Sequence, residues 1–184
     1  MLEPLTAFGR ATAETVTIGP YTITERFDVA LASLAQRRGL EAALSSAAKK
    51  AGVPLPAAAS SEAGAPWSAF WMTPEMWMIE APFASHEDIA AHLRAIFGEA
   101  ASITEQTDAW VRLDLAAPDL GPMLERLSNI DLATKPAGFA ARTVIEHLGV
   151  FLIKRGAGDV TLYGPRASAG SLLHALEVAA KSVL

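Results

Sequence analysis

Apolar and polar positions follow two periods along this chain, and four stretches with the helical period predict helices. These stretches cover residues 40–51, 85–97, 119–130 and 168–183. Gly52 and Pro54 follow the first stretch, which is typical of a helix end. Ser85 stands three residues before Asp88, a spacing that resembles a capping box at the start of the second. Pro122 fits only the first turn of the third helix.

Segments rich in β-branched and aromatic residues lie between these helices and predict strands. They cover residues 29–37, 67–72, 76–81, 102–107, 109–115, 141–155 and 160–163, with a hairpin turn at 156–159. The order strand, helix, strand, strand, helix therefore occurs twice. It predicts an α+β fold of two ferredoxin-like β-α-β-β-α repeats, with mainly antiparallel sheets and helices on one face.

The same pattern predicts the domain organisation of the chain. Residues 1–28 form an N-terminal extension or an edge hairpin, with strands at 15–18 and 21–24 around Gly19-Pro20. Residues 29–107 form the first repeat and 108–184 the second, and we expect one compact domain in total. Residues 53–66 are rich in Ala, Ser and Pro, so we expect a flexible linker there.

Composition narrows the classes of function. The chain has 184 residues, no cysteine and a net charge of −5. The missing thiols exclude disulfides and cysteine nucleophiles and fit a cytoplasmic protein. Scattered basic residues argue against nucleic-acid binding, and no apolar run is long enough for a membrane span or a secretory signal.

The histidines predict no metal site or catalytic dyad. His86 and His92 are six residues apart on one predicted helix, which turns them about 120° away from one another. Glu146 and His147 are adjacent within a predicted strand, so they face opposite sides of the sheet. We therefore expect ordinary surface or packing roles, or contact with a partner.

The acidic residues and the known motifs also predict no catalytic group. Asp108, Asp114, Asp119 and Asp131 cluster around the third helix, but Asp119 suits an N-cap and Asp131 a turn. A nucleophile elbow, a Walker loop and a dinucleotide-binding glycine motif are absent. We assign no catalytic, cofactor-binding or metal-binding residue.

An aromatic and methionine-rich block is the strongest anomaly of composition. It contains Trp67, Phe70, Trp71 and Trp77 among Met72, Met76 and Met78, so both faces of the strands are apolar. Either the other repeat covers the second face, or a partner subunit or a small molecule does. Trp67, Trp71, Met76 and Trp77 are the candidate subunit interface.

Several short motifs resemble one known family in their order and spacing. They are LASLAQRRG at 31–39, Leu55-Pro56, the region of Trp71, Pro74 and Trp77, TEQTDAWVRLDL at 104–115, Asp131-Leu132, residues 136–143 and PRASAGSLLHAL at 165–176. On these motifs the chain resembles the gamma subunits of heterotetrameric sarcosine oxidases. It is more distantly similar to the aminomethyltransferase and folate-binding-protein superfamily.

This resemblance implies a noncatalytic subunit of a complex that oxidatively demethylates sarcosine to glycine. The complex produces hydrogen peroxide and transfers the one-carbon unit to tetrahydrofolate. The resemblance implies alpha, beta and delta subunits as partners, and places FAD, FMN, NAD and tetrahydrofolate in them rather than in this chain. We expect the isolated chain to be inactive.

Two other functions stay open. A stand-alone folate-binding or aminomethyltransferase-like protein would bind folate by itself. A self-associating scaffold unrelated to sarcosine would form a stable homo-oligomer.

Overall fold

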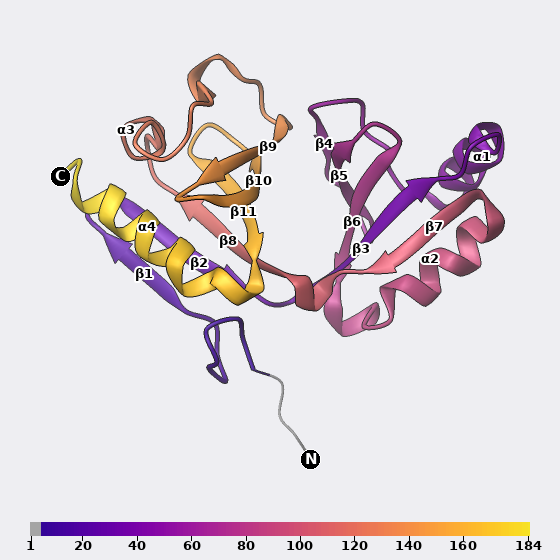
Figure 1. Cartoon of the computed structure of the whole chain (residues 1–184), viewed down its shortest axis with the longest axis horizontal. Helices are drawn as coiled ribbons and strands as arrows, with labels where there is room; N and C mark the ends of the chain where they lie inside the picture. Colours follow the sequence, from indigo (N-terminus) through magenta and orange to yellow (C-terminus); the bar gives the residue numbers. More distant parts are fainter. Residues whose placement is uncertain (1–4) are drawn as a thin grey trace. The chain divides into compact units, whose positions relative to one another are not determined.

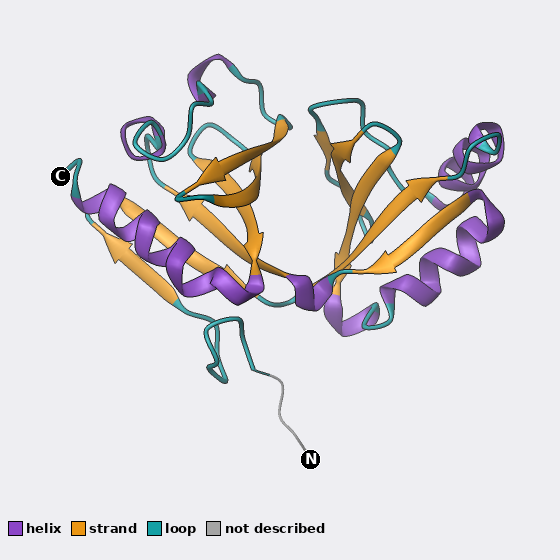
Figure 2. Cartoon of the chain, viewed as in Figure 1, coloured by secondary structure: helices purple, strands orange, loops and turns teal. Residues whose placement is uncertain are grey.

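The computed structural model describes residues 5–184. Where the sequence predicts one compact domain, the chain divides into two compact units (Figures 1 and 2). Asp28–Thr107 forms the central unit, and the described residues 5–27 form the terminal unit together with Asp108–Leu184. No helix within residues 5–184 combines the length and the apolar character that crossing a membrane requires.

The central unit is an antiparallel sheet with two helices packed on one face (Figure 2). Its elements are β3 (Val29–Gln36), α1 (Glu41–Ala51), β4 (Ser61–Glu62), β5 (Ser68–Thr73), β6 (Met76–Pro82), α2 (Ile89–Phe97) and β7 (Ala101–Glu105). The strand order is β4-β5-β6-β3-β7. Leu44 of α1 and Leu93 of α2 are buried against Leu34 and Ile79 of the sheet. Each such aliphatic side chain contributes about 1.5–3 kcal/mol when it is fully buried.

The terminal unit has the same construction, although its strands come from both ends of the chain. Its elements are β1 (Thr15–Ile18), β2 (Tyr21–Arg26), β8 (Trp110–Ala116), α3 (Gly121–Leu124), β9 (Ala140–Ile145), β10 (Leu148–Lys154), β11 (Asp159–Pro165) and α4 (Ala169–Lys181). The strand order is β1-β2-β8-β11-β10-β9. Leu172 and Leu176 of α4 are buried against Leu113 and Leu162. Short 3-10 turns cover Phe83–Ser85, Gly98–Ala100, Thr107–Ala109, Leu132–Thr134 and Arg166–Ser168.

The five strands of the central sheet match five of the six strands of the terminal sheet in order, with β1 as the additional strand, which confirms the predicted α+β fold of two ferredoxin-like repeats with antiparallel sheets. In the central unit, β3 lies between β6 and β7, and in the terminal unit β8 lies between β11 and β2. The place that β7 holds in the central unit is taken by β2, which comes before β8 in the chain. The predicted edge hairpin is therefore an integral part of the terminal sheet.

The first and last predicted helices agree with the structure, whereas the second begins at Ile89 rather than Ser85 and the third is much shorter. Gly52 ends α1 in the left-handed conformation, with φ of 67°. The helix expected over 119–130 is only α3 (Gly121–Leu124), because the N–H groups of Arg126 and Leu127 donate three residues back rather than four. Beyond it, the Ser128 hydroxyl accepts from the Ile130 N–H and lies 3.1 Å from Thr143 Oγ1. Serine side chains that bond nearby backbone compete with helical hydrogen bonding.

Residues 53–66, expected as a flexible linker, make specific contacts with the central unit. Val53 is buried in the core cluster, and Leu55 packs against that cluster. The N–H of Trp71 donates to the carbonyl oxygen of Ser60 at 3.0 Å, next to the pairing of β4 with β5.

Candidate functional site

Trp67, expected at a subunit interface, lies in the core of the central unit. It is 6% exposed and belongs to the cluster between the sheet and its helices. Its ring meets the imidazole of His86 edge-on, with centroids 4.7 Å apart. Trp67 therefore presents little surface to a partner.

The other three candidates lie around the turn between β5 and β6, and all are half-buried. Trp71 and Trp77 are cross-strand partners on the helix-covered face. Trp77 packs against the core, and its indole Nε1–H donates to the carbonyl oxygen of Pro56 at 2.8 Å. Met76 alternates to the opposite face of β6. The structure thus brings Trp71 and Trp77 together and separates Met76 from them.

Apolar residues on the helix-free face of this sheet are buried as well. Phe70 and Met78 have no exposed surface. Trp71, Met72, Met76 and Trp77 are the members of the aromatic and methionine block that keep partial exposure. Within the aromatic and methionine block, the surface left for a partner therefore lies at the tip of the β5–β6 hairpin.

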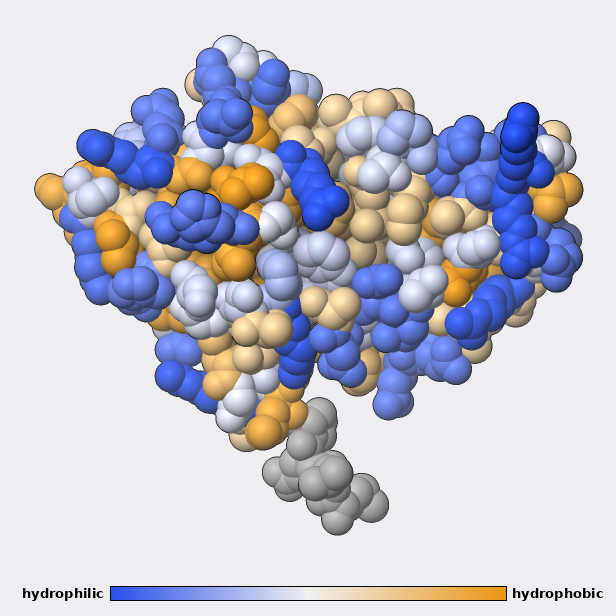
Figure 3. Space-filling view, in the orientation of Figure 1, coloured by the Kyte–Doolittle hydropathy of each residue, from blue (hydrophilic) through white to orange (hydrophobic). Residues whose placement is uncertain are grey.

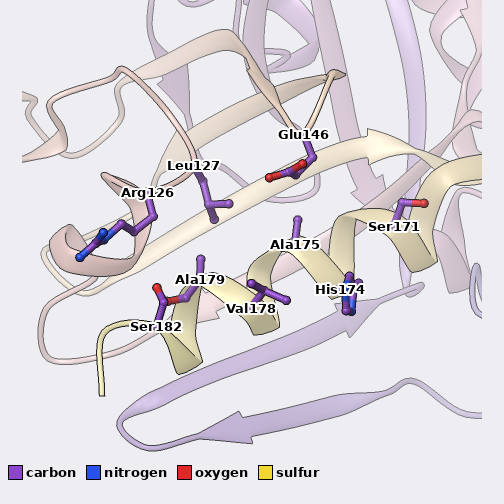
Figure 4. Close-up of a pocket in the computed structure, with 9 residues that line it drawn as sticks. All are labelled: Arg126, Leu127, Glu146, Ser171, His174, Ala175, Val178, Ala179 and Ser182. Carbon is purple, nitrogen blue, oxygen red and sulfur yellow. The ribbon is translucent and has the colours of Figure 1, made fainter.

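A groove of about 500 Å³ runs along α4 in the terminal unit (Figure 4). Leu127, Ala175 and Ala179 form part of its apolar lining, and Val178 is 51% exposed beside them. Arg126 comes from the segment after α3 and Glu146 from the β9–β10 turn. In the space-filling view, apolar surface gathers over this part of the terminal unit and is interrupted by hydrophilic side chains (Figure 3). An apolar lining between charged side chains suits a polypeptide segment or a small amphipathic molecule.

A second cavity, of about 390 Å³, lies over a charged network on the helix-free face of the terminal sheet. The carboxylate of Asp114 accepts two hydrogen bonds from Arg112, at 2.9 and 3.0 Å, and one from the Thr161 hydroxyl at 2.7 Å. Arg26 lies 3.6 Å from the same carboxylate. Arg155 donates to Thr161 at 3.1 Å. Asp114 thus neutralises neighbouring guanidinium groups, which is a structural role.

The other three aspartates of the sequence cluster also have local structural roles. Asp119 accepts a hydrogen bond from the Gly121 N–H at 2.8 Å at the start of α3. Asp131 caps the 3-10 turn Leu132–Thr134 through the Ala133 N–H. Asp108 forms an exposed ion pair with Arg166 at 3.8 Å. The structure therefore does not gather these carboxylates into one site.

Two expectations about histidine are wrong. The helix begins at Ile89 rather than near Ser85, so His86 precedes it, and its ring lies 5.0 Å from that of His92. Glu146 and His147 are not strand residues but the two-residue turn between β9 and β10, both with positive φ. Sequence periodicity missed the histidine contact because it placed both residues on one regular helix.

The described residues, 5–184, contain no group of three or more His, Cys, Asp or Glu side chains placed to hold a metal ion.

The fold is shared with two solved structures of known proteins. A chain of heterotetrameric sarcosine oxidase from Corynebacterium sp. U-96, in complex with pyrrole 2-carboxylate, matches with a TM-score of 0.77 and 21% identity. The match covers 92% of this chain and 88% of that chain. Glycine cleavage system aminomethyltransferase T from Bartonella henselae matches with a TM-score of 0.60 and 13% identity. That match covers 85% of this chain and 48% of the transferase.

No protein-family model matches the chain, and no curated protein sequence does. The resemblance that the motifs indicate is thus confirmed in three dimensions, at the level of the fold.

Proposed function

We propose that this chain is the gamma subunit of a heterotetrameric sarcosine oxidase. In this proposal it assembles with alpha, beta and delta subunits in the cytoplasm and performs no chemistry itself. The partner subunits bind FAD, FMN, NAD and tetrahydrofolate. The assembled complex converts sarcosine to glycine with formation of hydrogen peroxide and transfer of the one-carbon unit to tetrahydrofolate.

One observation carries the proposal: the fold matches a sarcosine oxidase chain nearly from end to end in both chains. Because both are covered almost fully, that chain is of similar length, as a small subunit would be. In contrast, the match to aminomethyltransferase T spans about half of that enzyme.

The tip of the β5–β6 hairpin supports an assembly role. Half-buried Trp71 and Met76 flank the exposed turn at Thr73–Glu75. Tryptophan and methionine are enriched in the cores of protein interfaces. We assign the subunit contact to Trp71 and Met76, with Trp77 supporting Trp71 from the neighbouring strand.

Co-purification tests the assembly. The tagged chain, isolated from its native host grown on sarcosine, is expected to bring down larger subunits whose absorbance spectrum shows flavin. The same preparation is expected to form peroxide when sarcosine is added. Recovery of the chain without flavoprotein partners contradicts the proposal.

Variants of the hairpin test the contact surface. Trp71→Ser and Met76→Ser are expected to lower the yield of partner subunits while the circular dichroism of the isolated chain stays unchanged. Val144→Ser is the matched control, because Val144 is an exposed apolar residue, at 59%, on a strand of the other unit. If the hairpin variants retain full recovery of partners, the contact lies elsewhere; if they unfold, the residues belong to the core.

A stand-alone folate-binding protein is the second candidate, because the fold also matches an aminomethyltransferase. The purified chain alone, titrated with tetrahydrofolate in a calorimeter, separates the two candidates. Stoichiometric binding favours the folate-binding function, and the absence of binding favours the subunit.

A further inference from the structure

His86 and His92 form a close pair at the start of α2. Their ring centroids are 5.0 Å apart and their planes are tilted by 53°. His86 is half-buried against Trp67, and His92 is exposed in the first turn of the helix. The pair exists because Asp88 caps the helix, accepting from the Ala91 N–H at 3.0 Å, so the chain turns between the two histidines.

Hydrogen bonds engage the same nitrogen on both rings. Nδ1 of His92 lies 3.0 Å from the carbonyl oxygen of Asp88, which can only accept, so Nδ1 carries the proton. Nδ1 of His86 lies 2.9 Å from Oγ of Ser85, whose hydroxyl donates to the carbonyl oxygen of Pro82. In the tautomer that matches this donation, the Ser85 Oγ accepts a hydrogen bond from Nδ1–H of His86. Each ring is left with Nε2 as the nitrogen that has an unshared electron pair.

The hydrogen bond at Nδ1 is a feature that this pair shares with metal-binding histidines. A ligating histidine commonly donates its second ring N–H to an oxygen, which fixes the tautomer and the ring orientation. With metal–nitrogen distances of about 2.0–2.1 Å and a tetrahedral angle, two imidazoles on one ion have centroids roughly 5 Å apart. The observed separation agrees with that value.

We propose that His86 and His92 bind one divalent transition-metal ion through their Nε2 atoms. Imidazole favours copper, nickel and zinc, and the Irving–Williams order makes Cu²⁺ the tightest of the three. Within residues 5–184 no further His, Asp or Glu completes a protein cage, so water fills the remaining positions. The bound ion links the segment before α2 to its first turn and stabilises the start of that helix.

Titration of the full chain with Cu²⁺, followed by electron paramagnetic resonance, tests the site. The absence of cysteine removes competing thiolates. We expect saturable binding of one ion whose spectrum shows coupling to two nitrogen nuclei. Because Trp67 touches His86, quenching of tryptophan fluorescence follows the same binding curve.

Single substitutions decide between this site and adventitious binding. His92→Ala removes one of the two ligands, at an exposed position. Losing an outer-shell partner typically lowers metal affinity by about 10- to 100-fold, and we expect the loss of a direct ligand to lower the Cu²⁺ affinity by more than that. His86→Gln is expected to have the same effect while keeping a polar side chain beside Trp67. His147→Ala and His174→Ala are the controls and leave binding unchanged. Equal affinity in His92→Ala and the parent chain overturns the proposal.

Discussion

The indole of Trp77 donates a hydrogen bond to the carbonyl oxygen of Pro56, 2.8 Å away and 21 positions earlier in the chain. This bond attaches the segment 53–66 to the sheet of the central unit, together with the burial of Val53. A segment with the composition of a linker is therefore fixed by its neighbours rather than by its own propensities.

Trp77→Phe is expected to lower the free energy of unfolding by about 1–3 kcal/mol, because the Pro56 carbonyl loses its partner. Urea denaturation of the purified chain measures the change. Trp71→Phe is the matched control: it makes the same replacement on the cross-strand partner of Trp77. Equal losses in both variants would mean that ring size, not the hydrogen bond, sets the cost.

Asp114→Asn is expected to destabilise the protein by about 1.5–3 kcal/mol, the usual value of hydrogen bonds to a charged group. The substitution removes the charge that Arg112 and Arg26 surround. Denaturant unfolding at constant ionic strength gives the value. Asp108→Asn, at a side chain that is 89% exposed, serves as the comparison and is expected to stay within about 0.5 kcal/mol of the parent chain.

The double variant Glu146→Asn, His147→Gly is expected to have a free energy of unfolding about 1 kcal/mol higher than that of the parent chain. Both positions have positive φ, 48° and 69°, and the two-residue hairpin turn they form favours Asn-Gly. Asparagine and glycine tolerate this conformation better than Glu and His do. Thermal unfolding checks the gain. An unchanged or lower midpoint would show that Glu146 or His147 makes a compensating contribution.

The pKa of the Glu41 carboxyl is held below its ordinary value of 4.5 by hydrogen bonds from the backbone N–H groups of Glu41 itself and of Gly39. Because the folded pKa is the lower one, the stabilisation is complete above pH 4.5 and is lost as the pH falls through the folded value. We expect Glu41→Gln to remove this part of the acid sensitivity. Carboxyl titration by nuclear magnetic resonance measures the pKa directly, and an ordinary value would contradict the assignment.

Local patterns in the sequence predict the regular elements well. The α1 helix and its Gly52 end, the turn before β6 and the α4 helix all depend on neighbours within a few residues, which the sequence displays directly. The matching orders β4-β5-β6-β3 and β9-β10-β11-β8 follow from the repeated order of elements.

Contacts between distant parts of the chain account for what the sequence does not reveal. The pairing of β2 with β8 places Thr24 opposite Asp114, and the pattern of apolar and polar residues does not predict this pairing. The meeting of His86 and His92 depends on where α2 begins, and a shift of a few residues at a helix start decides which side chains touch. The sequence places Trp67 at an interface from its residue type alone. Its burial depends on how the whole unit packs, which the residue type does not reveal.

The pairing of β2 with β8 also sets an order for folding on the ribosome. The central unit is one continuous stretch, so its residues emerge together and can pack as soon as they are made. The β1–β2 hairpin emerges before β8. The residues of β8 that pair with β2 are synthesised about 90 residues later, so β2 has no partner on that edge until then. At about 5–20 residues per second this delay is roughly 5–18 s. During that time β2 presents an unpaired edge that a chaperone or another nascent chain can meet first.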